Sequence, residues 1–336
     1  MYLDSIKIVN FRNHRKLDLY FTKGFNYITG NNGTGKTSVV EAVHTILNGK
    51  SFRQNQFQKL VNFNQVSFYL QAYLSKDDFN YKLSFNYDKN VTIYKNGKRI
   101  NNLSSYIYNN PVLVYSPENE GLLSDNQENK RRFLDKICFY YSTEHLVVLK
   151  DYSKLLKIKK NMLNFNNPDT LYFQSVTEEL KKLSDKIQNN RIFILELLNN
   201  KLDYIKHDIF KNIEDFRFII QNSKIENSEY KEELKRRKIL RGAHLDKIYV
   251  EYCDRKYESF ASFGQKKSFS LASLASAVLI VEEILKNDII VVLDDLEVGL
   301  DENRINAFRE FFNKNQVFIT GVKNNFFTDG HIIHLQ

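Results

Sequence analysis

Hydrophobic positions recur with two different periods along this chain, and the period changes twice. Before about residue 120, runs such as 66–74 and 81–87 have the aromatic and β-branched content of strands. An Asn-Gly pair at 96–97 is typical of a tight hairpin turn. From about 121 to 240 glycine is nearly absent and apolar residues recur every three or four positions, as on one face of a helix. After about 241, strand-like and helix-like segments alternate again.

The clearest helical pattern lies in this middle region. Its apolar stripe consists of Leu180, Leu183, Ile187, Ile194, Leu198, Leu202, Ile205 and Ile209. The segment 166–169, which contains Pro168, interrupts the pattern before the stripe, so a helical hairpin is predicted. We therefore expect an α/β head built from residues 1–120 and 241–336 together, with 121–240 as an inserted α-helical domain.

A phosphate-binding loop is the strongest chemical motif. Residues 30–37 read Gly-Asn-Asn-Gly-Thr-Gly-Lys-Thr and fit GxxxxGK[ST], between a predicted strand at 24–29 and a predicted helix at 37–47. Glycines allow backbone N–H groups to face phosphates, and the helix N-terminus adds partial positive charge. Lys36 should reach the β- and γ-phosphates of ATP, and Thr37 should bind Mg²⁺. The expected loop residues are Gly30, Asn31, Asn32, Gly33, Thr34, Gly35, Lys36, Thr37 and Ser38.

Two acids follow an apolar run much later in the chain. Residues 289–293 read as a buried strand that ends in Asp294 and Asp295. Such a strand would carry Asp294 to the carboxyl edge of a parallel sheet, where nucleotides bind. Asp294 would then hold Mg²⁺, directly or through water, and Asp295 could act as the base that polarises the attacking water. Without the phosphate loop, the pair could equally be two solvated acids at a strand end.

A third element lies between these two motifs. Ser262, Phe263, Gly264 and Gln265 precede an apolar helix, rich in small residues, that runs from Phe269 to about Lys286. This helix should be largely buried against the sheet that carries Asp294. In several ATPase families, a Ser-Gly-Gln loop of this kind completes the nucleotide site of a neighbouring subunit.

Composition narrows the class of protein. The chain has 336 residues, of which 42% are hydrophobic, as in ordinary soluble globular proteins. No run approaches the ~20 apolar residues that span a bilayer, and the first residues lack the pattern of a secretory signal. The two cysteines, Cys138 and Cys253, have no metal-ligand spacing, which indicates a reducing compartment and no zinc site.

The charge balance leaves two interpretations open. The net charge is +9, a modest excess that is common in proteins that contact phosphate backbones. The basic residues form two clusters, Lys154, Lys157, Lys159 and Lys160, then Lys231, Lys235, Arg236, Arg237, Lys238 and Arg241. Each cluster could equally be a solvated helix face. No DNA-reading motif such as a helix-turn-helix is visible, so base-specific recognition is not expected.

Taken together, the motifs resemble the RecF family of bacterial DNA-repair ATPases, which are relatives of the SMC proteins and of ABC-type ATPases. The similarity runs nearly end to end. The matching runs are 8–13 (Ile-Val-Asn-Phe-Arg-Asn), 30–37, 115–118 (Tyr-Ser-Pro-Glu), 130–135 (Lys-Arg-Arg-Phe-Leu-Asp), 242–246 (Gly-Ala-His-Leu-Asp), 262–267, 293–295 and 300–301. The fold that this resemblance implies is an ABC/SMC-type P-loop ATPase head with an inserted α-helical domain.

The resemblance also implies a function. RecF-like proteins are cytoplasmic, bind ATP and DNA, and form dimers with ATP held between the subunits. They hydrolyse ATP slowly and act with RecR and RecO to help load RecA at gapped DNA. By position, Ser262 would touch the γ-phosphate bound to the other subunit, Asp301 would belong to a dimer-facing loop, and Arg12 would lie near the nucleotide. Thr320 stands where many relatives have a histidine switch.

Two other functions stay open at this point. The chain could be a different P-loop enzyme, either a kinase or a transporter ATPase subunit. A kinase would not need the Ser-Gly-Gln loop, and a transporter subunit would ordinarily have histidine in place of Thr320. The chain could also be a non-hydrolysing DNA scaffold in which ATP only joins the dimer. The presence of Lys36, Asp294 and Asp295 argues against a scaffold.

Overall fold

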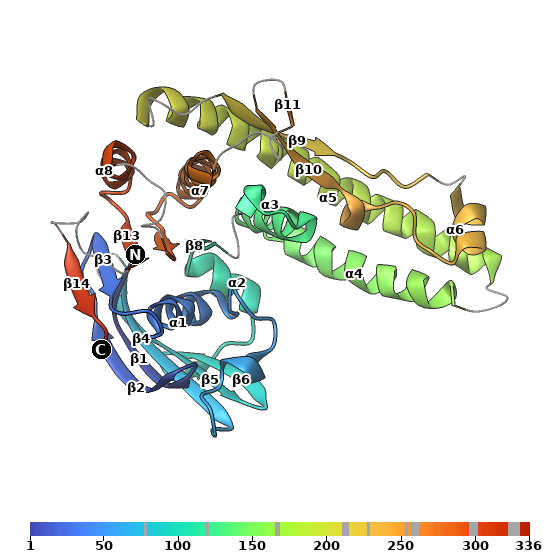
Figure 1. The fold of residues 1–336 in the computed structure, drawn as a ribbon. Helices are drawn as coiled ribbons and strands as arrows, with labels where there is room; N and C mark the ends of the chain where they lie inside the picture. Colours follow the sequence, from blue (N-terminus) through green and yellow to red (C-terminus); the bar gives the residue numbers. More distant parts are fainter. Residues whose placement is uncertain are drawn as a thin grey trace. The chain divides into compact units, whose positions relative to one another are not determined.

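The structure is a computed structural model that describes residues 1–76, 79–117, 121–164, 169–209, 215–226, 229–252, 255–256, 263–295, 302–321 and 330–336. The chain forms two compact units (Figure 1). The first comprises Met1–Glu120, Ile205–Ile213 and Ser262–Gln336, and the second comprises Gly121–Tyr204 and Glu214–Ala261. The division differs from the expected one in two places: Ile205–Ile213 belong to the first unit, and the second boundary lies at residue 261 rather than 240. The second boundary is displaced because β10 (Lys247–Tyr252) pairs with β9 (Phe216–Gln221) of the second unit.

A five-stranded parallel sheet forms the centre of the first unit. Its order is β14 (His331–His334), β3 (Phe25–Thr29), β13 (Gln316–Gly321), β12 (Ile290–Leu293) and β8 (Val112–Tyr115). All four pairings are parallel. Every residue of β8, β12 and β13 is buried, as expected for parallel strands with both faces covered. The phosphate loop and the paired acids follow β3 and β12, so they meet at the same edge of the sheet.

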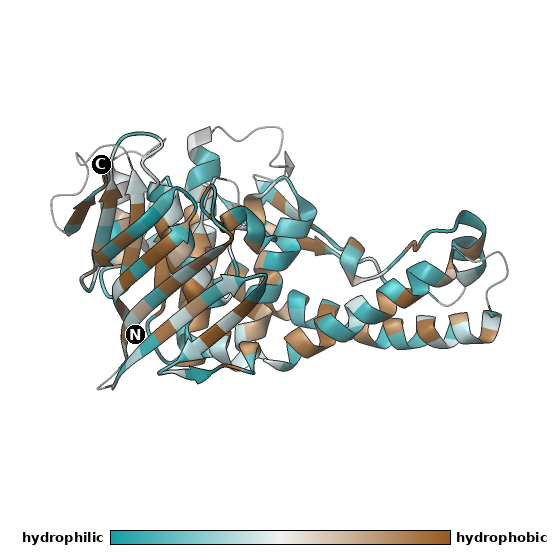
Figure 2. Ribbon diagram, turned by 90° about the horizontal axis from the view of Figure 1, so that it is seen from below, coloured by the Kyte–Doolittle hydropathy of each residue, from teal (hydrophilic) through white to brown (hydrophobic). Residues whose placement is uncertain are grey.

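A six-stranded antiparallel sheet forms the second layer of this unit. Its order is β2 (His14–Tyr20), β1 (Tyr2–Phe11), β4 (Ser67–Lys76), β5 (Phe79–Asp88), β6 (Asn90–Lys95) and β7 (Lys98–Arg99). Apolar and polar positions alternate along its strands (Figure 2). The predicted Asn-Gly turn is confirmed, because Lys95 pairs with Lys98 and both Asn96 and Gly97 have positive φ.

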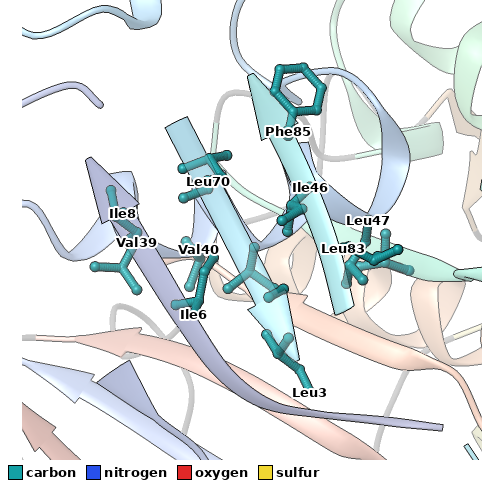
Figure 3. Packing of buried hydrophobic residues seen from close by; sticks show 14 of the residues in the cluster. Leu3, Ile6, Ile8, Val39, Val40, Ile46, Leu47, Leu70, Leu83 and Phe85 are labelled. Carbon is teal, nitrogen blue, oxygen red and sulfur yellow. The ribbon is translucent and has the colours of Figure 1, made fainter. Parts of the chain in front are cut away.

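The helix that follows the phosphate loop lies between the two sheets. Residues Val39 to Asn48 of α1 (Lys36–Asn48) are all buried, and the helix contacts strands of both sheets. Figure 3 shows Val40 and Ile46 of α1 among Ile6, Leu70 and other apolar residues of the antiparallel sheet. Each such side chain contributes about 1.5–3 kcal/mol on burial. This packing fixes the start of α1, and with it the backbone that should receive phosphates.

Among the described residues, the other helices of the first unit are α2 (Leu103–Asn109), α7 (Phe263–Leu285), α8 (Glu302–Phe311), the short 3₁₀ turn η1 (Phe57–Leu60) and the π-helical turn η3 (Ile205–Ile209). Helix α7 contacts β8, and its described side chains from Phe269 onward are mostly buried, which confirms the expected burial of this apolar helix. By length and composition alone α7 could span a bilayer, but 78% of its most apolar stretch is buried inside the protein. It is therefore a core helix.

The second unit is mainly helical. It contains η2 (Gly121–Leu123), α3 (Gln127–Tyr141), α4 (Glu144–Met162), α5 (Thr170–Tyr204), α6 (Tyr230–Arg236) and η5 (Ala243–Leu245), with a small sheet in the order β11 (Arg255–Lys256), β10, β9. Helices α4 and α5 pack against each other, and the predicted hairpin is thereby confirmed (Figure 1). Leu180, Ile187 and Ile194 of the apolar stripe are buried in α5.

A buried polar network joins two of the sequence motifs inside this unit. Arg191 donates to both oxygens of Asp135 at 2.8 Å and to Asp246 Oδ2 at 2.8 Å. His145 Nε2 also lies 3.0 Å from Asp135 Oδ1. Burial alone would raise the pKa of Asp135, but Arg191 and His145 hold it below its usual value. The runs 130–135 and 242–246 thus meet around Arg191, and removing one partner would leave a buried charge uncompensated.

Candidate nucleotide-binding site

A cavity of about 730 Å³ lies in the first unit at the carboxyl ends of β3, β12 and β13. Predicted site residues from both ends of the chain line it, namely Arg12, Asn32, Gly33, Gly35, Lys36, Thr37, Ser38, Asp294 and Asp295. Thr320, at the end of β13, lines it as well. The volume falls in the range of ordinary small-ligand pockets. The two strongest sequence motifs therefore share one cavity.

The phosphate loop is held by its own side chains. Lys36 Nζ donates to the carbonyl oxygens of Gly30 at 2.7 Å and Asn31 at 2.9 Å. Thr34 Oγ1 donates to the Asn31 carbonyl at 2.9 Å. Gly30 cannot carry a side chain, because a Cβ there would lie 2.5 Å from the carbonyl oxygen of Leu335. Gly30, Asn31 and Thr34 thus shape the loop, while the Lys36 ammonium group is held beside the cavity.

The turn between β1 and β2 covers the phosphate loop. Asn13 Nδ2 donates to the Gly33 carbonyl at 3.4 Å, and His14 Nε2 lies 3.1 Å from the Gly35 carbonyl oxygen. Gly35 has φ 94°, and a Cβ there would collide with the side chains of Asn13 and His14. Only glycine fits this position, both for its backbone conformation and for the close approach of the turn.

Asp294 connects the ends of β12 and β13 to the start of α1. Its Oδ1 accepts hydrogen bonds from Thr37 Oγ1 at 2.9 Å and from Thr320 Oγ1 at 2.7 Å. Burial raises the pKa of Asp294, and the two hydroxyl groups only partly offset this effect. A hydroxyl oxygen and a carboxylate oxygen this close are the hard ligands that Mg²⁺ prefers, so the pair fits a magnesium site.

Asp295 is held in an unusual backbone conformation. Its φ is 55°, in the left-handed region that aspartate tolerates better than most residues. Its N–H donates to Thr320 Oγ1 at 2.9 Å, and its carbonyl accepts from Lys267 Nζ at 3.0 Å. The Asp295 side chain is exposed on the cavity. Thr320 therefore links the two acids through one hydroxyl group, and the carboxylate of Asp295 is left available for chemistry.

Arg12 lines the cavity, but its guanidinium group forms an ion pair with Glu41 on α1. Nε and Nη2 donate to the two Glu41 carboxylate oxygens, each at 2.8 Å, and Nη1 donates to the Lys59 carbonyl at 3.1 Å. Glu41 is fully buried, and Ser51 Oγ donates to it at 2.5 Å. This bidentate pair fastens the β1–β2 turn to the phosphate-loop helix.

Arg12→Ala should therefore destabilise the protein even without nucleotide. The change leaves the buried Glu41 carboxylate without its cation, which costs about 3–5 kcal/mol. Urea denaturation of the free protein measures this loss. Glu41→Gln in the Arg12→Ala background should recover part of it. The control Arg15→Ala, at an exposed position of β2, should stay within about 0.5 kcal/mol of wild type. Equal effects at positions 12 and 15 would show that the pair is unimportant.

Sequence reasoning missed five residues of the cavity, three of them polar or charged (Asn13, Arg53 and Lys59) and two apolar (Val61 and Pro117). With Arg12 and Lys36, the lining contains four cationic side chains, against the carboxylates of Asp294 and Asp295. An excess of positive charge suits a polyphosphate. Arg53 follows α1 and Lys59 lies in η1, but single basic residues outside a motif are too common in sequences to be singled out.

Four other predicted site residues, Ser262, Gly264, Gln265 and Asp301, are not among the described residues that line this cavity. Gly264 and Gln265 lie at the start of α7, and neither is among the described residues that line the cavity. Gly264 accepts a hydrogen bond from Ser268 Oγ at 2.9 Å. Ser262 and Asp301 lie outside the described residues.

The sequence matches a known family over almost its whole length. The family model described as the RecF/RecN/SMC N-terminal domain covers residues 2–334. A protein of Clostridium kluyveri named DNA replication and repair protein RecF is 28% identical over 342 residues, covering 95% of this chain and 92% of the relative. A protein of the same name from Clostridium botulinum is 27% identical over 341 residues, with the same coverage of both chains.

Solved structures share the fold. A structure of the recombination mediator protein RecF with ATP, in the RecFOR pathway, has a TM-score of 0.89 at 24% identity and covers 99% of this chain and 95% of that chain. The Smc head domain of Pyrococcus furiosus, with an extended coiled coil, has a TM-score of 0.56 at 14% identity and covers 100% of this chain and 94% of that chain. The predicted fold class, a RecF- and SMC-type ATPase head, is confirmed.

Proposed function

Because the chain belongs to the RecF/RecN/SMC N-terminal domain family, we propose that it is an ATPase that binds DNA under the control of ATP during replication and repair. The single observation that carries the proposal is the contact between Thr37 and Asp294. These residues are far apart in the sequence, yet their side chains meet at 2.9 Å in a cavity rich in cations. A phosphate loop and a strand-end acid in this arrangement form a nucleotide site.

Each residue of the cavity has a role in this proposal. Lys36, held beside the loop, would exchange its bonds to the Gly30 and Asn31 carbonyls for bonds to β- and γ-phosphate oxygens. Thr37 and Asp294 would hold Mg²⁺, which when bound neutralises charge on the phosphates. Asp295 would orient the attacking water and accept its proton. Its backbone is fixed from both sides, by Thr320 and by Lys267.

The dimer is the next part of the proposal. We infer that ATP bound to one subunit is closed by the loop at Ser262–Gln265 of a second copy, with Asp301 near the same interface. Among the described residues, Gly264 and Gln265 do not line the cavity of their own subunit, which fits residues that serve a neighbouring one. ATP would then act as the link between subunits, and slow hydrolysis would release them.

The biological setting follows from the relatives. Curated relatives carry the name DNA replication and repair protein RecF, and the solved structures that share the fold include a recombination mediator protein in the RecFOR pathway. We infer that this chain acts in the cytoplasm at gapped single- and double-stranded DNA and helps RecO and RecR to load RecA. Binding should depend on phosphate contacts rather than on base sequence, as the net charge of +9 suggests.

Oligomeric state and DNA affinity, measured with ATP–Mg²⁺, with ADP–Mg²⁺ and without nucleotide, test the proposal. Sedimentation should show a dimer with ATP and a monomer in the other two conditions. Fluorescence anisotropy with gapped DNA should show tighter binding with ATP, and a scrambled sequence of the same structure should bind equally well. A kinase or a transporter ATPase subunit would bind no DNA. A non-hydrolysing scaffold would remain dimeric with ATP indefinitely.

A further inference from the structure

The two basic clusters of the sequence come together at one end of the second unit. Lys159 Nζ, on α4, lies 2.6 Å from Glu233 Oε2, on α6, and both side chains are almost fully buried. Glu233 Oε1 also accepts from the N–H of Leu240 at 2.9 Å. In Figure 1, α6 lies beside the end of α4 and the beginning of α5. Segments more than 70 residues apart in sequence are thus fixed side by side by a buried ion pair.

An apolar cluster under this ion pair makes the arrangement rigid. It contains Met162 of α4, Phe173 and Val176 of α5, and Ile239 after α6, with Tyr230 and Leu234 packed against it. Lys159 Nζ also lies 5.1 Å from the centre of the Phe173 ring. Because α4, α5 and α6 are fixed against one another in this way, the exposed side chains on their outer faces keep constant relative positions and form one surface.

That outside surface carries a concentration of exposed cations, which we call the arm-tip surface. It consists of Lys157, Lys160, Lys231, Lys235, Arg236, Arg237, Lys238 and Arg241, all exposed. The acids that pair within it, Glu229 and Glu232, bind Arg241 and Arg236. Within the part of the chain that the structure describes, Lys157, Lys160 and Lys235 form no ion pair.

One residue of this surface, Lys160, contributes to the lowered pKa of a half-buried histidine in the same unit, His244. His244 Nδ1 lies 2.7 Å from the hydroxyl oxygen of Tyr152, a buried residue of α4. Burial, followed by the positive charges of Arg131, Lys159, Lys160 and Arg191, lowers the pKa of His244 to about 4. Of these four cations only Lys160 belongs to the arm-tip surface, and it is the exposed cations of that surface that would attract an anion.

We propose that the arm-tip surface binds the sugar–phosphate backbone of DNA, as a contact separate from the nucleotide site. This inference rests on the proposed DNA-binding function. Exposed lysines on flexible stems suit phosphates, which they neutralise without reading bases. An acidic protein partner is less consistent with this composition, because lysine is depleted at the centres of protein–protein interfaces. The ion pair between Lys159 and Glu233 would hold both clusters side by side, so that they contact the same stretch of the DNA backbone.

A matched pair of triple variants tests the proposal in the full-length protein with ATP–Mg²⁺. The test variant carries Lys157→Gln, Lys160→Gln and Lys235→Gln. The control carries Lys150→Gln, Lys224→Gln and Lys247→Gln, which removes the same charge from exposed lysines elsewhere in the second unit. The logarithm of DNA affinity is plotted against the logarithm of salt concentration. The slope should fall by about three units in the test variant, roughly 0.9 per lost phosphate contact, and affinity at 0.15 M salt should fall on the order of 10²-fold.

The opposite change gives an independent check. Glu232→Gln frees Arg236 from its exposed ion pair, so DNA affinity and the salt slope should both rise. ATP affinity and the unfolding midpoint should match wild type in all three variants, because every changed residue lies on the surface of the second unit. If the test variant keeps the wild-type slope, or if the control loses as much, the arm-tip surface does not bind DNA although the proposed function stands. If wild-type protein with ATP binds no DNA, the proposed function itself is wrong.

Discussion

Lys36→Ala should raise the dissociation constant for ATP by on the order of 10²-fold or more, measured by calorimetric titration. Lys36 is the only full positive charge inside the phosphate loop, and its ammonium group lies within hydrogen-bond distance of two loop carbonyls. Hydrogen bonds to charged groups contribute about 1.5–3 kcal/mol each, and about 1.4 kcal/mol is tenfold in affinity. The loss of two such bonds to phosphate oxygens accounts for the expected change.

The ATP-dependent dimer should disappear in the same variant, because dimerisation in this account requires bound nucleotide. Lys16→Ala, at an exposed position of β2, provides the matched control and should bind ATP as wild type does. The role given to Lys36 would be untenable if the Lys36→Ala protein were folded and bound ATP with normal affinity.

Asp294→Asn should abolish most hydrolysis while leaving the free protein at least as stable as wild type. Burial raises the pKa of Asp294, so at neutral pH its charged form is held in the folded protein at a cost in stability. That cost disappears as pH falls through the raised pKa and the carboxyl group takes up its proton. Asparagine carries no charge at any pH and can still accept from Thr37 and Thr320. Stability of the variant should therefore depend less on pH between neutral and acidic conditions.

Although the stability of the Asp294→Asn protein should not fall, its rate of ATP hydrolysis should. Without the carboxylate, Mg²⁺ loses a ligand, and hydrolysis should slow by on the order of 10²-fold or more. Asp295→Asn should slow hydrolysis by a similar factor but keep Mg²⁺–ATP binding, so that the ATP-bound dimer persists longer. Steady-state ATPase rates together with Mg²⁺ titrations distinguish the two variants. If Asp294→Asn slows turnover and Asp295→Asn does not, the base is not Asp295.

Local sequence patterns predicted the parts of the site that are contiguous in the chain. The phosphate loop, its flanking strand and helix, the Asn-Gly turn and the buried helix α7 each depend on neighbouring residues, whose propensities and spacing act locally. The strand-end pair Asp294–Asp295 was placed at the sheet edge because parallel strands end together.

Pairings between distant residues could not be predicted in the same way. Arg12 with Glu41 and Arg191 with Asp135 and Asp246 depend on tertiary packing, and nothing in the spacing of these residues marks them as partners. The domain boundary at residue 261 could not be predicted either, because it also depends on a pairing between distant segments. The alternation in β10 indicates a strand but does not say which strand it pairs with, and pairing with β9 places it in the second unit.

The most direct measurement of the central claim, that each ATP is held by two subunits, is the ATPase activity of mixed variants. Lys36→Ala and Ser262→Arg proteins should each be inactive alone. After equimolar mixing and subunit exchange, about half of the dimers should be heterodimers, each with one intact site, so about a quarter of wild-type activity should return if sites act independently. If activity stays at background at every mixing ratio, no intact site forms between subunits, and ATP is not shared in the proposed way.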